Sequence, residues 1–167
     1  MSGGPPSPFA GLRVGYVLAP AGKNEAILSA MRATCRMATS LMAEIAARWI
    51  ANGTADALVD FQRREVAARR EMATRLLAEF PSRTHPKSFG MLIPLPEPWR
   101  AQAFVAELKS KGVLVLPAET FAVVPATAPQ AVRVCLCAAR GRAEVERGLD
   151  LLAETLRATP RPTAAVV

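Results

Sequence analysis

The spacing of apolar residues predicts two long helical stretches in the first half of the chain. From Asn24, read as an N-cap, apolar residues recur every three or four positions as far as Asn52-Gly53. This stretch is long for one helix, so we predict a break at Thr39-Ser40. The pattern restarts at Thr54 and continues to Phe80, where Pro81 ends it. The first stripe consists of Ile27, Met31, Cys35, Ala38, Met42, Ile45 and Trp49.

Charged runs interrupt the second stripe at two places. Arg63-Arg64-Glu65 and Arg69-Arg70-Glu71 place opposite charges on adjacent helical turns. We interpret both runs as a solvated helix face, because paired surface charges of this kind are usually exposed. A face that binds nucleic acid would carry more arginines and fewer glutamates.

After residue 80, short apolar runs alternate with amphipathic stretches. Strands are predicted near Ser88, at 113–117 and at 131–137. Helices are predicted at 100–111, ended by Gly112, and from Arg142 onward. The final helix carries the apolar stripe Val145, Leu149, Leu152 and Leu156. The predicted fold class is therefore α/β, with an α+β small domain whose small antiparallel sheet is covered by helices.

Two predicted strands each carry one arginine among apolar neighbours. In 131–137, Val132, Val134 and Leu136 share one face, while Arg133 lies on the other with small thiols. In Gly11-Leu-Arg-Val-Gly-Tyr-Val-Leu-Ala-Pro20, Arg13 shares a face with Gly15 and Val17. A guanidinium at such a position either reaches solvent or binds an anion, and the spacing alone leaves both interpretations open.

Composition and charge set limits on the class of protein. The chain has 167 residues, of which 51% are hydrophobic and 21% charged, as expected of one globular domain with irregular ends. Its net charge of +7 invites a nucleic-acid interpretation, but the charges are scattered through helices and no DNA-reading motif is recognisable. We therefore do not expect nucleic acid to bind through this chain.

Cysteine and histidine usage predicts neither a disulfide framework nor a metal site. Cys35, Cys135 and Cys137 lack metal-ligand spacing, and reduced thiols indicate a cytoplasmic protein. His85, the single histidine, is interpreted as structural or exposed. No signal peptide or bilayer-spanning run is recognisable, so no membrane association is expected.

The segment around Arg13 resembles the fold-type I pyridoxal-phosphate aminotransferases of class I/II, in particular the MocR/GntR-like branch of bacterial regulators. In that family the matching arginine binds the cofactor phosphate, a role that the resemblance implies for Arg13. The family's lysine that forms the Schiff base with pyridoxal phosphate stands seven residues earlier, where this chain has Pro6. The resemblance therefore implies a cofactor that this chain alone does not bind covalently.

The second half of the chain resembles the small C-terminal domain of the same family. The similar segments are Leu92–Trp99, Lys111–Pro117 and Ala131–Val134. In the last of these the family's arginine binds the substrate α-carboxylate, so the resemblance implies that Arg133 binds an amino acid or 2-oxo acid. It also implies a homodimer or a partner large domain, because family active sites form at dimer interfaces.

The composition of the two ends and the resemblance of the rest together predict five segments along the chain. These are an irregular arm at 1–10, a strand derived from the large domain at 11–20, long connecting helices at 21–80, the small C-terminal domain at 81–158, and a disordered tail at 159–167.

Three functions remain open from the sequence. The first is the C-terminal portion of a MocR-like aminotransferase that supplies two arginines and does not transaminate alone, since the residues that handle the cofactor ring are expected before Arg13. The second is a non-catalytic binding or assembly module that pairs with an aminotransferase large domain or a transcriptional regulator. The third, a nucleic-acid-associated protein, rests on charge only.

Overall fold

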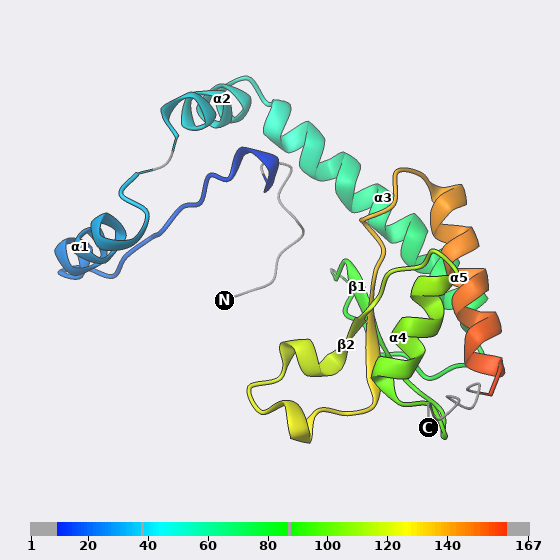
Figure 1. The fold of residues 1–167 in the computed structure, drawn as a ribbon. Coiled ribbons are helices and arrows are strands. Elements are labelled where there is room, and N and C mark those ends of the chain that lie inside the picture. The colour runs from blue at the N-terminus through cyan, green and yellow to red at the C-terminus, as the bar shows by residue number, and fades with distance from the viewer. Residues whose placement is uncertain (1–9, 38, 87, 160–167) are drawn as a thin grey trace. The chain divides into compact units, whose positions relative to one another are not determined.

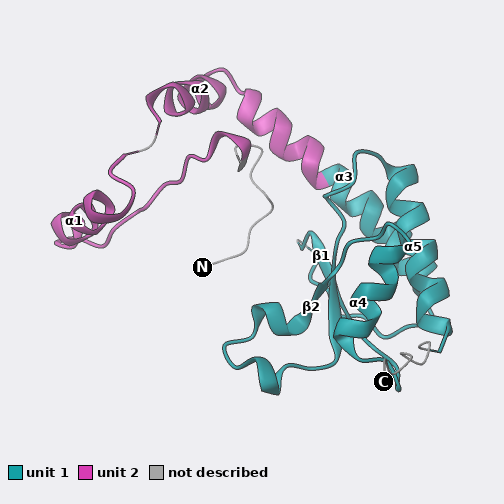
Figure 2. Cartoon of the chain, viewed as in Figure 1, with its two compact units in different colours: residues 1–5, 64–167 teal, residues 6–63 magenta. Residues whose placement is uncertain are grey.

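The computed structural model describes residues 10–37, 39–86 and 88–159 and divides them into two compact units (Figures 1 and 2). Unit 2 holds the described residues up to Arg63, and unit 1 holds those from Arg64 onward. Most of the predicted arm at 1–10 and of the predicted tail at 159–167 lies outside the described residues. None of the described helices is long and apolar enough to cross a bilayer.

Unit 2 is helical. It contains the short 3-10 helix η1 (Ala10–Leu12), α1 (Asn24–Thr34), α2 (Ser40–Ala51) and the first part of α3 (Thr54–Leu76). The break predicted at Thr39-Ser40 is confirmed, because α1 ends at Thr34 and α2 begins at Ser40. Asn24 is the first residue of α1, and Lys23 is its N-cap.

The strand predicted at 11–20 is wrong. After η1 the chain turns at Arg13, whose φ of 55° lies in the left-handed region, and residues 14–20 belong to no strand. A strand persists only where a neighbour accepts its backbone hydrogen bonds, and unit 2 contains no other strand among its described residues.

Unit 1 is built on a three-stranded antiparallel sheet. Its strands are β1 (Gly90–Pro94), β2 (Leu116–Pro117) and β3 (Ala131–Cys135), in the order β1-β3-β2. Two short 3-10 helices, η2 (Ala118–Phe121) and η3 (Pro125–Thr127), follow β2. The helices of the unit are the second part of α3, then α4 (Ala101–Ser110) and α5 (Arg142–Arg157).

The strand predicted at 113–117 is shorter than expected. Gly112 adopts a φ of 81°, as predicted for the residue that ends α4. The Gly112 N–H donates to the Lys109 carbonyl at 3.0 Å, and the Val113 N–H donates to the Leu108 carbonyl at 2.9 Å. This Schellman closure uses the backbone of Val113 to end the helix, so pairing with β3 begins only at Leu116.

The core of unit 1 lies between the sheet and its helices (Figure 1). Trp99 and Phe104 pack edge to face with ring centroids 5.1 Å apart. All four residues of the predicted α5 stripe are buried, and so is Val132 on β3. The buried cluster comprises Ala73, Leu77, Met91, Ile93, Trp99, Phe104, Leu108, Val115, Val132, Leu136, Val145, Leu149, Leu152, Ala153 and Leu156.

Candidate functional site

Arg133 lies on the central strand of the sheet, on the face opposite the core. In the register of the ladder it pairs with Leu92 of β1 on one side and Leu116 of β2 on the other. Its neighbours in sequence, Val132 and Val134, point toward the core, so alternation leaves Arg133 exposed on the open face. The predicted face for Arg133 is therefore confirmed.

Two residues from other elements position the Arg133 guanidinium. A Cβ added to Gly90 would lie 3.2 Å from Nε of Arg133 and 3.1 Å from the Val134 carbonyl oxygen, so the side chain lies where only glycine leaves room. On the other side, Cζ of Arg133 lies 5.0 Å from the ring centroid of Phe121, at the end of η2. The guanidinium is thus held between a strand backbone and an aromatic ring.

Arg133 lines an open cavity of about 370 Å³ on this face. Its other lining residues come from β1 and from the segment before it: Arg83, Thr84, His85, Ser88, Gly90, Met91 and Leu92. We call this the arginine cavity. The hydroxyls of Thr84 and Ser88 both donate to the Gly90 carbonyl, at 3.1 and 2.9 Å, which fixes the loop that forms its wall.

The arginine cavity has the composition of an anion site. No acidic residue lines it, and neither Arg83 nor Arg133 forms an ion pair within the described part of the chain. An arginine presents a planar fork of donors that suits a carboxylate bidentately. The cavity can therefore bind a small carboxylate through Arg133.

Arg13 and Arg133, the two site residues expected from the sequence, belong to different units. Arg13 is exposed in unit 2, on the turn that follows η1. A Cβ added at Gly11 or Gly15 would meet no atom within 4 Å, so no described group crowds this turn. The described residues around Arg13 therefore form no enclosed site for the ring of pyridoxal phosphate.

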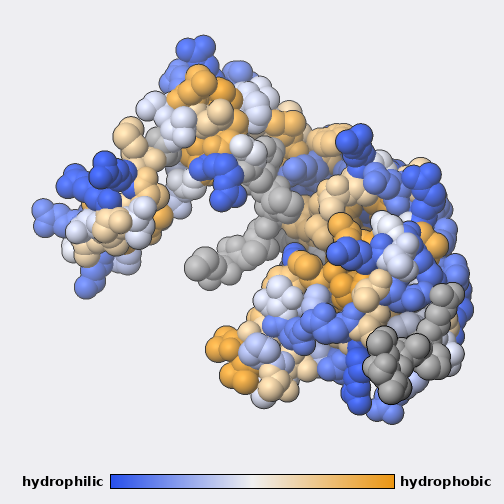
Figure 3. All heavy atoms as spheres, in the orientation of Figure 1, coloured by the Kyte–Doolittle hydropathy of each residue, from blue (hydrophilic) through white to orange (hydrophobic). Residues whose placement is uncertain are grey.

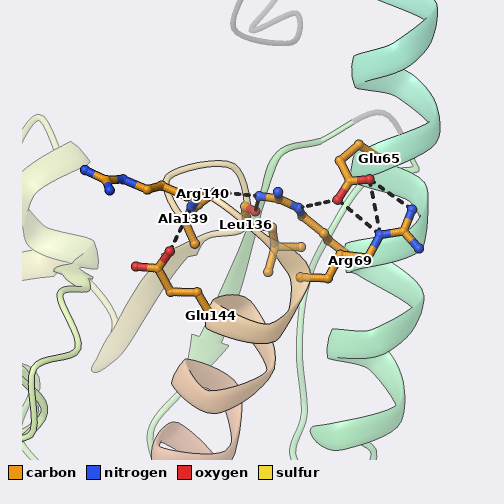
Figure 4. A network of polar contacts seen from close by, with 7 residues as sticks. Glu65, Arg69, Leu136, Ala139, Arg140 and Glu144 are labelled. Carbon is orange, nitrogen blue, oxygen red and sulfur yellow. Dashed lines mark hydrogen bonds and ion pairs between the residues drawn. The ribbon is translucent and has the colours of Figure 1, made fainter.

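A second polar group, which sequence analysis did not predict, joins α3 to the segment after β3 (Figure 4). Arg69 is buried and donates to the carbonyl oxygens of Leu136 and Ala139 at 2.9 and 3.0 Å, and to Glu65 at 2.9 Å. Arg142 donates to Glu65 as well, also at 2.9 Å. We call Glu65, Arg69 and Arg142 the α3 ion network.

The α3 ion network corrects one part of the interpretation of the two charged runs as a solvated face, because Arg69 is buried. Three other residues of these runs are exposed, namely Arg63, Arg64 and Glu71. Hydrogen bonds from Arg142 and then from Arg69 lower the pKa of Glu65 from 4.5 to about 2. The i, i+4 spacing of Glu65 and Arg69 suggested a surface pair, and only the segment after β3 supplies the carbonyls that allow Arg69 to be buried. No local sequence signal indicates those carbonyls.

The cysteines form no metal centre or disulfide among the described residues. Burial raises the pKa of Cys137 to about 11, whereas Cys35 and Cys135 are exposed. His85 is exposed at the arginine cavity, which agrees with the interpretation of it as structural or exposed.

Comparison with solved structures gives the fold of this chain. It is similar to a kynurenine aminotransferase of Pyrococcus horikoshii solved with PMP, with a TM-score of 0.76 and 19% identity, covering 87% of this chain and 37% of that one. It is also similar to LysN, an alpha-aminoadipate aminotransferase of Thermus thermophilus, with a TM-score of 0.77 and 16% identity, covering 88% and 38%. The expected α/β fold class is confirmed by these likenesses.

The sequence of this chain is also similar to that of a transcriptional regulator. An uncharacterized HTH-type transcriptional regulator of Bacillus subtilis (strain 168), YdeF, is 29% identical over 146 residues, which is 87% of this chain and 32% of the regulator. This similarity fits the MocR/GntR-like branch named by the sequence resemblance. The chain spans about a third of the length of the proteins it matches.

The family model for aminotransferase class I and II matches residues 9–152, from just before the Arg13 turn into α5. The match thus includes both arginines, the whole sheet and the arginine cavity. With most of its length matched, this chain belongs to the class I and II aminotransferase family.

Proposed function

We propose that this chain is the C-terminal portion of a pyridoxal-phosphate-dependent aminotransferase-like protein of the MocR type, in which Arg133 binds the α-carboxylate of an amino acid or 2-oxo acid. One observation carries the proposal. Arg133 lies at the centre of the open sheet face, between Gly90 and Phe121, in a cavity that no described acidic residue lines. A small carboxylate can therefore reach this guanidinium from solvent.

We propose that Arg13 contributes one contact to the cofactor phosphate in the assembled fold. Pyridoxal phosphate supplies the electron-withdrawing ring on which transaminases depend. The chain holds no lysine at the position that the family resemblance gives to covalent attachment, where Pro6 stands, so the 167-residue chain does not transaminate alone. On this proposal the remaining cofactor contacts and the dimer partner come from a large domain.

Pyruvate titration tests the carboxylate role. We expect weak binding of pyruvate to the 167-residue chain, observed by NMR as shifts of the backbone amide resonances of the residues that line the arginine cavity. Arg133→Gln is expected to abolish it. Arg147→Gln, at an exposed site on α5 and of equal charge change, is the matched control and should retain binding. Equal binding by Arg133→Gln and the control would refute the carboxylate role.

Borohydride reduction tests the cofactor role. After incubation with pyridoxal phosphate and reduction, mass spectrometry should find only scattered substoichiometric labelling of the four lysines. One lysine labelled stoichiometrically would contradict the statement that this chain lacks the attachment residue.

A second candidate is a non-catalytic module that pairs with an aminotransferase large domain or a regulator. Unit 2 favours it, because many of its large apolar side chains are exposed among the described residues. Pyruvate binding distinguishes the candidates. A module that only assembles should form complexes with a large domain, as measured by light scattering, and should bind pyruvate no more tightly than its Arg133→Gln variant does.

A further inference from the structure

A second arginine faces the arginine cavity from a position outside the three-stranded sheet. The Arg83 N–H donates to the Leu92 carbonyl at 2.8 Å, and the Leu92 N–H donates to the Arg83 carbonyl at 2.9 Å. Arg83 is therefore paired with β1 as a one-residue extension of the sheet. Residues paired directly across antiparallel strands project their side chains to the same face.

The register places Arg83 and Arg133 in one row across the sheet. Arg83 pairs with Leu92, and Leu92 pairs with Arg133. With a strand spacing of about 4.7–4.9 Å, the two arginine Cα atoms are about 10 Å apart. Because the Arg133 side chain passes over Gly90, its guanidinium extends from β3 toward β1, the strand with which Arg83 pairs.

Both residues line the arginine cavity, and neither has a carboxylate partner among the described residues. Three described arginines of unit 1, Arg69, Arg142 and Arg157, are bound to glutamates, whereas Arg83 and Arg133 are two unpaired arginines that line one cavity. Two like charges on one cavity wall repel each other, and an anion bound near both of them offsets that repulsion. A ligand with two negative groups can pair one group with Arg83 and the other with Arg133.

We propose that Arg83 is a specificity-determining residue that, together with Arg133, makes the arginine cavity selective for a dicarboxylate, that is, an acidic amino acid or a 2-oxo diacid. Arg133 binds one carboxylate, as in the proposed function on which this inference rests. Arg83 binds the second, and the intervening methylenes of the ligand lie over Leu92. The hydroxyls of Thr84 and Ser88 are committed to the Gly90 carbonyl, so the two guanidinium groups carry the selectivity.

Titration of the 167-residue chain with glutarate and butyrate at constant ionic strength tests this assignment. Glutarate and butyrate share a similar carbon chain and differ by one carboxylate. We expect glutarate to bind about two- to fivefold more tightly, the range typical of one additional exposed charge pair. The Nε–H resonances of both Arg83 and Arg133 should shift with glutarate, and that of Arg133 alone with butyrate.

Arg83→Gln is expected to reduce glutarate affinity to that of butyrate while leaving butyrate affinity unchanged. Arg147→Gln makes the same change of net charge away from the cavity and should keep the glutarate preference. Absence of a glutarate preference in the unmodified chain, or an equal effect of Arg83→Gln and Arg147→Gln, would overturn the assignment of Arg83.

The test separates this inference from the proposed function. If Arg133→Gln leaves butyrate affinity unchanged, the carboxylate role of Arg133 fails. A glutarate preference that depends on Arg83 but survives Arg133→Gln would overturn the paired site as well, because it requires a different partner for the first carboxylate.

Discussion

Units 1 and 2 are built from helices with comparable apolar stripes, yet only one of them buries its stripe. In unit 1, Phe104 and Leu108 of α4 are fully buried against the sheet. In unit 2, α1 has no buried residue, and Leu18, in the segment before α1, is 100% exposed. An amphipathic stripe therefore specifies a helix, whereas a core also requires a facing element with its own apolar surface.

The exposed apolar residues are not confined to unit 2. In unit 1, Phe121, Val123 and Val124 of the η2–η3 segment are exposed, and Figure 3 shows apolar side chains gathered on the projecting part of this unit. These residues border the Arg133 face through Phe121. The exposed large apolar residues of unit 1 lie in the η2–η3 segment and at Leu114 and Leu116, whereas those of unit 2 extend from Tyr16 to Phe61.

The largest effect on the free energy of unfolding is expected from a substitution in the core, and a substitution at an exposed residue is its control. Phe104→Ala should lower the free energy of unfolding by about 3–5 kcal/mol, because it removes a fully buried ring that packs on Trp99. Leu18→Ala should change it by less than about 0.5 kcal/mol. Urea denaturation followed by tryptophan fluorescence measures both, and similar losses would show that unit 2 has an equivalent core.

The next comparison uses two arginines of α3. Arg69→Met should cost about 2–4 kcal/mol, because it leaves the Leu136 and Ala139 carbonyls without this donor and removes one partner of Glu65. Arg63→Met removes an exposed pair with Asp60 and should cost at most about 1 kcal/mol. Equal effects in thermal unfolding would contradict the burial of the α3 ion network.

A smaller effect is expected on the pH dependence of stability. The pKa of Glu65 is lowered to about 2 in the folded chain from 4.5, so its ion pairs stabilise the fold above pH 4.5. That contribution is lost as the pH falls from 4.5 toward 2. The stability difference between the unmodified chain and Glu65→Gln should shrink over this range, and a constant difference would exclude the linkage.

The smallest effect is chemical rather than energetic. At a pH of about 8, iodoacetamide should alkylate the exposed Cys35 of unit 2 faster than Cys137 of unit 1, because burial raises the pKa of Cys137 to about 11 and keeps it protonated. Peptide mass spectrometry after timed quenching gives both rates. Faster reaction at Cys137 would mean that its thiol is exposed to solvent.

Much of unit 1 was predictable from local patterns. The α5 stripe, the end of α4 at Gly112 and the outward face of Arg133 all depend on periodicity or on one residue's backbone preference. The arginine cavity was predictable only in part. Gly90 inside a strand is a recognised sign of close approach, but nothing near it in sequence identifies Arg133 and Phe121 as the groups on either side.

By itself, the sequence determined helix positions, the break before Ser40, the family resemblance and the face on which Arg133 lies, because these depend on neighbours a few residues away. Only the tertiary structure decided that residues 11–20 form no strand, that Arg69 is buried and that Arg83 shares a row with Arg133. Each of these depends on a backbone hydrogen-bond partner, present or missing, from a distant segment. The physical reason is that a strand or a buried charge needs hydrogen-bond partners from another segment. The tertiary fold determines which segments lie beside each other.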